Sequence, residues 1–247
     1  MAQQEDLPSD DAALESLLRD RRLGPTDPDD VTPWDFVFRW PDESVRQRVW
    51  PIVSRMLLDP DELIRERAVE FVRGWRKGVD VAIPRLLDVV EQHIDLFSQA
   101  VVEGIPIRET VAHALSNRAR ADSKRVVAQL RRLAADAPLG GGAAAVLGEY
   151  DPEFATQQAA RWGDAAIDWI DEAARSLALF RRDEVLPFLQ ALRGLSDGSR
   201  ERIVRVVGEY IKRDDAAAAS LARGDGLSPP AKRAPSPDDC RRAIGLG

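Results

Sequence analysis

Basic residues gather on one predicted helix, which is the clearest pattern for chemistry in this chain. Between 118 and 132, six cations accompany a single acid, Asp122; the cations are Arg118, Arg120, Lys124, Arg125, Arg131 and Arg132. At 100° per residue, the last four share one face of a helix over 122–135, and the opposite face is apolar. Guanidinium and ammonium groups suit the oxygens of phosphates or other anions. These six residues are therefore candidate anion-binding residues; the alternative is a face that is solvated or paired with acids elsewhere in the chain.

Tryptophan supplies a second pattern, because six tryptophans stand beside only two tyrosines. Exposed tryptophans stack on bases or anchor protein partners. Trp75 and Trp162 fall on apolar helical stripes, so we expect both in the core. Trp34 and Trp40 flank a short apolar run that we expect to cap the first helix pair. Trp169 is the least constrained and is the candidate for an exposed aromatic anchor.

The residue types that catalysis or metal binding needs are scarce. His93 and His113 are 20 residues apart, with no carboxylate or cysteine at ligand spacing, and Cys240 is the only cysteine. Acid pairs fall at turns, where aspartate caps helices, and no paired general acid and base is evident. We therefore expect no catalytic set, metal or cofactor and favour a protein that is not an enzyme. Cys240 lies in a segment expected to be loose, where a thiol could react.

The net charge of −7 is concentrated near the N-terminus, since residues 1–33 hold nine acids and three arginines. This segment is either a solvated tail or a segment that folds back on the basic helix and competes with an external anion. The remainder is nearly neutral, so an anionic ligand is not excluded. No apolar run is long enough to span a membrane, and no secretory signal is evident. With a single cysteine, the sequence favours a cytoplasmic protein with no membrane partner.

Apolar residues recur at helical spacing along most of the chain. In the segment 61–77, for example, Ile64, Ala68, Phe71 and Val72 form one stripe. A second helix is expected over 81–94, and a pair over 34–40 and 43–58 opens the array. Four further helix pairs are expected at 107–118 with 122–135, 143–150 with 152–162, 165–179 with 184–192, and 199–212 with 214–223.

Paired helices that repeat every 30–40 residues are typical of an α-solenoid. Self-similarity supports this, because the phrase Val-Leu-Gly-Glu-Tyr at 146–150 returns as Val-Val-Gly-Glu-Tyr at 206–210. We predict an all-α fold, a right-handed α-α superhelix of about five or six helix pairs over 32–223. An acidic, largely flexible N-terminal tail over 1–31 and a Pro/Gly-rich C-terminal tail over 224–247 flank it.

The segment 61–69 resembles the first helix of a HEAT repeat, with an acid, an Ile-Arg pair and a small residue at the matching offsets. Ile107 and Arg108 fit the same place in the next unit. Parts of the chain, over 58–86 and 161–229, are also similar to bacterial HEAT-like DNA alkylation-repair glycosylases. That resemblance implies excision of alkylated purines by a catalytic Asp with tryptophans and an Arg. At the corresponding positions this chain has Arg205, Glu172 and the Gly-Gly-Gly-Ala stretch at 140–143.

Two functions follow from these patterns. The first is a non-enzymatic adaptor that binds a protein or peptide in a concave groove. The second is a nucleic-acid binder that contacts phosphates through Lys124, Arg125, Arg131 and Arg132. An apolar or mixed groove favours the first, and a basic groove favours the second. A glycosylase is disfavoured, because no Asp stands with Trp and Arg at the matching positions.

Overall fold

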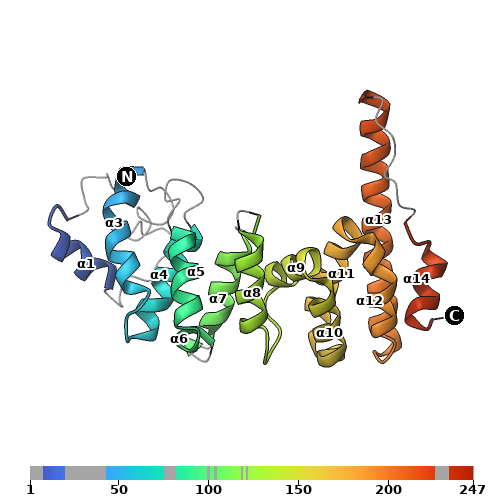
Figure 1. The fold of residues 1–247 in the computed structure, drawn as a ribbon, viewed down its shortest axis with the longest axis horizontal. Coiled ribbons are helices and arrows are strands. Elements are labelled where there is room, and N and C mark those ends of the chain that lie inside the picture. Colours follow the sequence, from blue (N-terminus) through green and yellow to red (C-terminus); the bar gives the residue numbers. More distant parts are fainter. Residues whose placement is uncertain are drawn as a thin grey trace, which may run out of the picture. The chain divides into compact units, whose positions relative to one another are not determined.

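The computed structural model describes residues 8–19, 43–74, 82–98, 101–102, 105–117, 119–120, 122–225 and 234–246, and helices dominate them (Figure 1). This confirms the predicted all-α class; the described strands are only two residues each. Two compact units divide the chain, residues 1–118 and residues 119–247. No helix among the described residues is both long and apolar enough to cross a membrane.

The first unit forms around α4, which packs against its neighbours α3, α5 and α7. Its elements are α1 (Asp11–Arg19), α3 (Glu43–Met56), α4 (Glu62–Gly74), α5 (Ala82–Gln92), α6 (Asp95–Ser98), β1 (Val101–Val102), β2 (Ile105–Pro106) and α7 (Ile107–Ser116). The two strands pair antiparallel. The apolar stripe predicted for α4 is buried, from Ile64 to Val72. Trp34, Trp40 and Trp75 lie outside the described residues.

Helix α1 anchors the described part of the acidic N-terminal segment in the first unit. Leu14 and Leu18 are buried. Glu15 accepts a hydrogen bond from Arg55 at 2.6 Å, and Arg19 pairs with the buried Asp59. Apolar and charged contacts therefore both hold this helix; the rest of the predicted tail, 1–7 and 20–31, lies outside the described residues.

The second unit forms around α11, which packs against α9 and α13. Its elements are α8 (Ser123–Leu133), α9 (Gly141–Tyr150), α10 (Pro152–Trp162), η2 (Gly163–Ala166), α11 (Ile167–Phe180), η3 (Arg182–Glu184), α12 (Val185–Ala191), α13 (Asp197–Asp225) and α14 (Pro237–Ile244). Small residues bring α9 and α11 together: a Cβ atom built on Gly148 would lie 2.9 Å from the carbonyl oxygen of Ala173. The side chain of Ser176 donates a hydrogen bond across the same contact, to the carbonyl of Ala145 at 2.7 Å.

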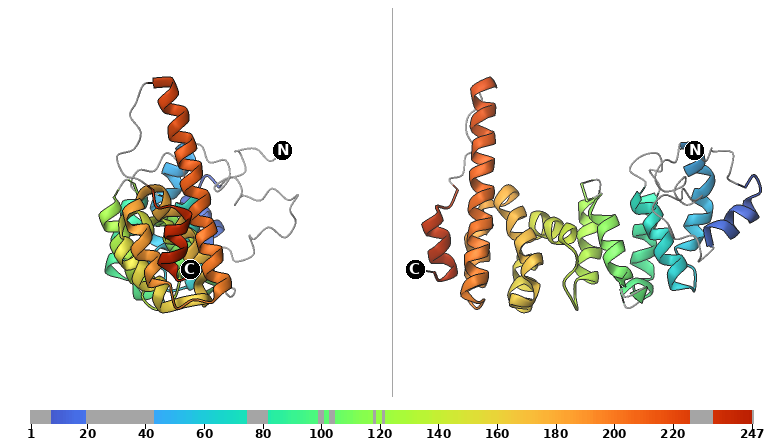
Figure 2. Two further views of the ribbon diagram at one scale, coloured as in Figure 1. Left: turned by 90° about the vertical axis from the view of Figure 1, so that its right-hand side faces the viewer. Right: turned by 180° about the vertical axis from the view of Figure 1, so that it is seen from behind.

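Helix α13 corrects the prediction of a helix pair over 199–212 and 214–223, because one continuous helix covers both segments. The expected break fell at Asp214 and Asp215, but both carboxylates accept hydrogen bonds from Arg182, at 2.6 and 2.8 Å. The segment that follows is rich in alanine, the best helix former. In Figure 1 and Figure 2 the C-terminal part of α13 extends well past α12 and α14.

Helix α14 corrects the prediction that the C-terminal segment is mostly irregular. The side chain of Ser236 accepts a hydrogen bond from the backbone N–H of Asp239, and the Asp239 carboxylate accepts one from the backbone N–H of Ser236, both at 3.1 Å. This reciprocal cap fixes the helix start. At the other end, Gly245 adopts a positive φ of 84° that favours glycine.

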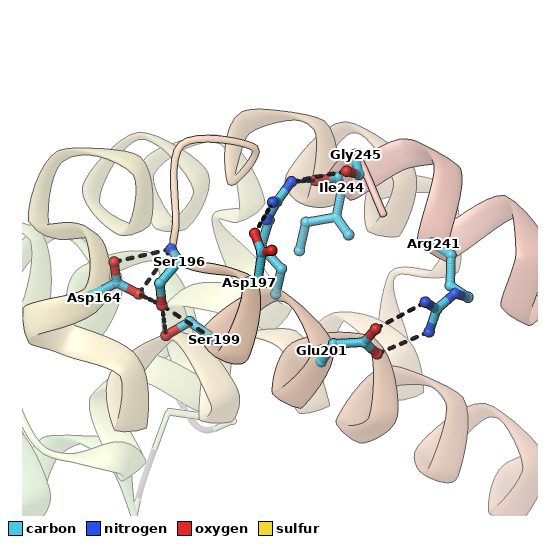
Figure 3. A network of polar contacts seen from close by, with 9 residues as sticks. Asp164, Ser196, Asp197, Ser199, Glu201, Arg241, Ile244 and Gly245 are labelled. Atoms are coloured by element: carbon cyan, nitrogen blue, oxygen red, sulfur yellow. Dashed lines mark hydrogen bonds and ion pairs between the residues drawn. The ribbon is translucent and has the colours of Figure 1, made fainter. Parts of the chain in front are cut away.

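Polar contacts and apolar burial hold α14 against α12 and α13. Arg241 donates to both carboxylate oxygens of Glu201 at 2.8 Å (Figure 3). Arg193 donates to the Ala243 carbonyl at 2.7 Å, and Arg200 donates to the Gly245 carbonyl at 2.9 Å. The buried side chains of α14 are Cys240, Ala243 and Ile244.

The docking of α14 predicts that Cys240 reacts slowly, whereas the sequence placed it in a loose segment where a thiol could react. Its residue is 1% exposed, and burial raises the pKa of the thiol to about 11. Because the thiolate is the reactive form, Ellman's reagent at about pH 8 should label the native chain at least about tenfold more slowly than the unfolded chain. Ile244→Ala, which removes a buried contact, should speed labelling. Equally fast labelling of native and unfolded chains would contradict this packing.

Candidate functional site

Helix α8 separates its apolar and basic residues on two faces, as the sequence predicts. Its buried side chains include Val126, Leu130 and Leu133, and its exposed cations are Lys124, Arg131 and Arg132. The helix begins after Asp122, whose carboxylate accepts a hydrogen bond from the backbone N–H of Arg125 at 3.3 Å. This cap sets the helix start, and burial of the apolar face turns the three cations away from the core.

The basic face borders an open hollow of about 570 Å³ within the second unit. Helix α8 contributes one side, and the corner between α9 and α10 contributes Tyr150 and Asp151. The cations of the lining are Lys124, Arg131 and Arg132, and its apolar side chains are Val127 and Ala128. The hollow is therefore mixed, with positive charge beside apolar surface.

Arg131 is held in place from two sides. Its Nε–H donates to the carboxylate of Asp151, whose side chain is only 8% exposed. Asp151 is fixed in turn, because it caps α10 and accepts a hydrogen bond from the backbone N–H of Phe154 at 3.4 Å. The guanidinium carbon of Arg131 lies 5.4 Å from the centre of the Phe154 ring, within the range of a cation–π contact. The hydrogen bond to Asp151 is the main cause that raises the pKa of Arg131.

Tyr150 brings a phenol to the same hollow. Burial raises the pKa of this phenol, and the Glu149 carboxylate raises it further, while Arg120 acts in the opposite direction. The influence of Arg120 on this phenol indicates that its positive charge lies near the corner. The phenol therefore stays protonated at neutral pH, and its single O–H is engaged by the Glu149 carboxylate.

The structure brings three of the six predicted cations into the lining and distributes the others. Arg132, in the lining, donates to the Gln129 side chain at 2.9 Å. Arg125 lies 3.9 Å from the Asp122 carboxylate beside the hollow, and Arg120 acts on Tyr150. Arg118 lies outside the described residues. The basic stripe is thus a real feature of α8, centred on Lys124 and Arg131.

Several arginines elsewhere in the second unit are engaged by acids of the same unit. Arg202 of α13 donates to Asp171 at 2.5 Å and to Asp168 at 2.6 Å, both on α11. Within α11, Arg175 donates to Glu172 at 2.8 Å. These pairs balance positive charge within α11 and between α11 and α13, and on α8 Arg131 is likewise paired with Asp151.

Sequence reasoning missed the side of the hollow that α9 and α10 provide. The Asp-Pro step at 151–152 is a signal for a helix start, and α10 does begin there. Nothing in the sequence links Asp151 to Arg131, which stands 20 residues earlier. Only the packing of α8 against α9, the helix that Asp151 ends, brings the two together.

Trp169 is not an exposed anchor, which corrects the prediction. Its residue is 3% exposed, and its ring packs edge-on against that of Trp162, with 5.1 Å between ring centres. The residues around Trp169 in the sequence are partly polar and partly apolar, so the sequence alone does not predict its contact with Trp162. Among the residues that the structure describes, no group of three His, Cys, Asp or Glu side chains is placed to hold a metal ion.

Comparison of the chain with family models, with curated proteins and with solved structures finds no match. The chemistry of the hollow therefore rests on its own residues. An ammonium and guanidinium groups can donate hydrogen bonds, and two aliphatic side chains provide apolar contact. This set can bind an anion that carries an apolar neighbour, without covalent chemistry.

Proposed function

We propose that this chain is a HEAT-like helical-repeat scaffold, a right-handed superhelix of five or six helix pairs, that binds an acidic segment of a partner protein beside α8. The hollow lined by Lys124, Arg131 and Arg132 carries the proposal. Its cations complement aspartate and glutamate side chains. Val127 and Ala128 complement the apolar residues between such acids.

A protein partner fits this surface better than a nucleic acid does. Duplex DNA carries one negative charge per about 1.7 Å of helix axis, so its binding surfaces need long rows of cations. Here three cations of α8 line one hollow, where Arg131 is paired with Asp151, and Arg202 and Arg175 of the same unit are paired with acids. The apolar side chains of the lining suit a peptide side chain rather than a phosphate. The mixed lining thus favours the adaptor over the nucleic-acid binder.

Charge reversal in the hollow should abolish binding of an acidic peptide. Fluorescence anisotropy with a labelled peptide that carries aspartate at every third position and leucine between should show binding that weakens as salt rises, because the contacts are ionic. Lys124→Glu with Arg132→Glu should weaken that binding at least about tenfold, through loss of attraction and added repulsion.

The matched control reverses two exposed cations of α13, Arg205 and Lys212, which leaves the net charge equal to that of the hollow variant. This control should bind nearly as the unchanged chain does. Single-stranded and duplex DNA are titrated in parallel. If the unchanged chain binds DNA more tightly than it binds the peptide, and the hollow variant loses that binding, the nucleic-acid function would replace the proposal. No binding of the peptide at low salt would refute the proposal.

A further inference from the structure

We infer that Arg131 is the anchor of this site, gripping one carboxylate of the partner through its two terminal nitrogens, and that Asp151 is the positioning residue that aims it. The inference rests on the proposed function, since it names the residue that recognises the acidic segment. It also specifies which acidic segments fit.

The contacts of Arg131 leave the outer end of its guanidinium available. The side chain is 51% exposed, and its Nε–H is the group that donates to Asp151. No described residue accepts a hydrogen bond from its two terminal nitrogens. Those nitrogens carry four of the five N–H groups of the guanidinium, in one plane. That end can therefore grip both oxygens of a carboxylate, the geometry that makes arginine selective for such anions.

Arg131 is also oriented before any ligand arrives. The carboxylate of Asp151 is nearly buried and is itself fixed as the cap of α10. The ring of Phe154, on the same helix, supports the guanidinium. A long arginine side chain normally loses rotamer freedom when it binds, and a side chain that is already fixed avoids most of that cost. We expect the affinity gained from this fixed orientation to exceed the affinity that the negative charge of Asp151 removes.

The spacing along α8 defines the ligand. Lys124 precedes Arg131 by seven residues, about 10 Å at 1.5 Å per residue. In the polyproline II conformation three residues complete one turn and span about 9 Å, so side chains three positions apart lie on the same side. Val127 and Ala128 lie between the two cations and contribute to the same lining. The ligand class is therefore an acidic segment in the polyproline II conformation, with two acids three positions apart and an apolar residue between them.

Asp151→Asn separates positioning from simple electrostatics, because the two accounts predict opposite signs. Removing a negative charge from a cationic hollow should tighten anion binding if only net charge matters. If Asp151 aims Arg131, the same variant should bind a peptide with this acid spacing at least about fivefold more weakly. Asparagine is as good a helix cap as aspartate, so α10 should keep its start. Circular dichroism melting of the variant checks this.

A second pair of variants tests the bidentate contact between Arg131 and a ligand carboxylate. Arg131→Lys keeps the charge and loses the planar fork, and it should weaken binding about tenfold. The matched control makes the same substitution outside the hollow: Arg205→Lys, at an exposed position of α13, should bind within about twofold of the unchanged chain. With a peptide of the same composition but adjacent acids, the two variants should no longer differ in their effect on binding.

The outcomes keep the two proposals apart. If the unchanged chain binds no acidic peptide, the proposed function fails and this inference fails with it. If the unchanged chain binds and Lys124→Glu weakens binding, but Asp151→Asn binds equally or more tightly, the inference alone is overturned. Equal effects of Arg131→Lys and Arg205→Lys would overturn it as well.

Discussion

Replacing Gly148 by alanine is expected to lower the free energy of unfolding by about 1–3 kcal/mol, the usual cost of overpacking. The reason is the close contact of α9 with α11. The added Cβ would lie 2.9 Å from the carbonyl oxygen of Ala173 and 3.2 Å from the Cβ atom of Ser176. Both are at or near the backbone of a packed helix, so α11 would have to shift. Helix propensity alone predicts the opposite, because alanine favours a helix over glycine by about 1 kcal/mol.

Gly208 is the matched control, since it occupies the same place in the second copy of the repeated phrase. A Cβ atom built on Gly208 would meet nothing within 4 Å. Gly208→Ala should therefore stabilise the chain by about 0.5–1 kcal/mol, because it removes backbone freedom from the unfolded state. Urea unfolding followed by circular dichroism measures both variants. Changes of the same sign at Gly148 and Gly208 would contradict the packing of α9 on α11.

Arg202→Gln is expected to make the stability of the chain strongly dependent on pH. Asp171 is buried between α11 and α13, and burial raises the pKa of its carboxyl above the usual range. Arg202, whose Nε lies 2.5 Å from the carboxylate, works against that rise and favours the charged form. Without Arg202 the pKa of Asp171 should rise further, because the buried negative charge loses its main partner.

The sign of the pH dependence follows from that upward shift. A carboxyl with a pKa higher in the folded chain than in the unfolded chain stabilises the fold at low pH. That stabilisation is lost as pH rises through the folded-state value. The Arg202→Gln variant should therefore match the unchanged chain near about pH 4 and become progressively less stable toward pH 7. Urea unfolding over this pH range gives the comparison.

The double variant Arg202→Gln with Asp171→Asn removes the titrating group. It should lose the additional pH dependence of Arg202→Gln alone, whatever its stability at any single pH. A pH profile of Arg202→Gln parallel to that of the unchanged chain would show that this carboxyl is not sensitive to its partner.

The sequence predicts most of the helices of this fold because local rules decide them. The apolar stripe of α4 and the two-faced pattern of α8 follow the helical period directly. The prediction fails where a tertiary contact overrides a local signal. Asp214 and Asp215 suggested a turn in the sequence. In the structure both lie within the continuous helix α13, and Arg182 of η3 pairs with both. In α14, a short helix with a good cap was hidden in a Pro/Gly-rich segment.

The candidate site divides in the same way. Its cationic side is visible in the sequence, because Lys124 and Arg131 share a face of one helix. Its other side is not visible, because Tyr150 and Asp151 reach the hollow only through the packing of α9 and α10. Trp169 was misplaced for a related reason: its burial depends on Trp162, which belongs to a different helix.

The most direct test of the account is an NMR titration of the full chain with the acidic peptide whose two acids are three positions apart. Backbone amide shifts locate the bound peptide without any substitution. The account predicts shifts concentrated at Val127, Ala128 and Arg131 of α8 and at Tyr150 and Asp151 across the hollow, weakening as salt rises. Saturable shifts centred on α13 and α14, or no shifts at low salt, would contradict the assignment of this hollow as the binding site.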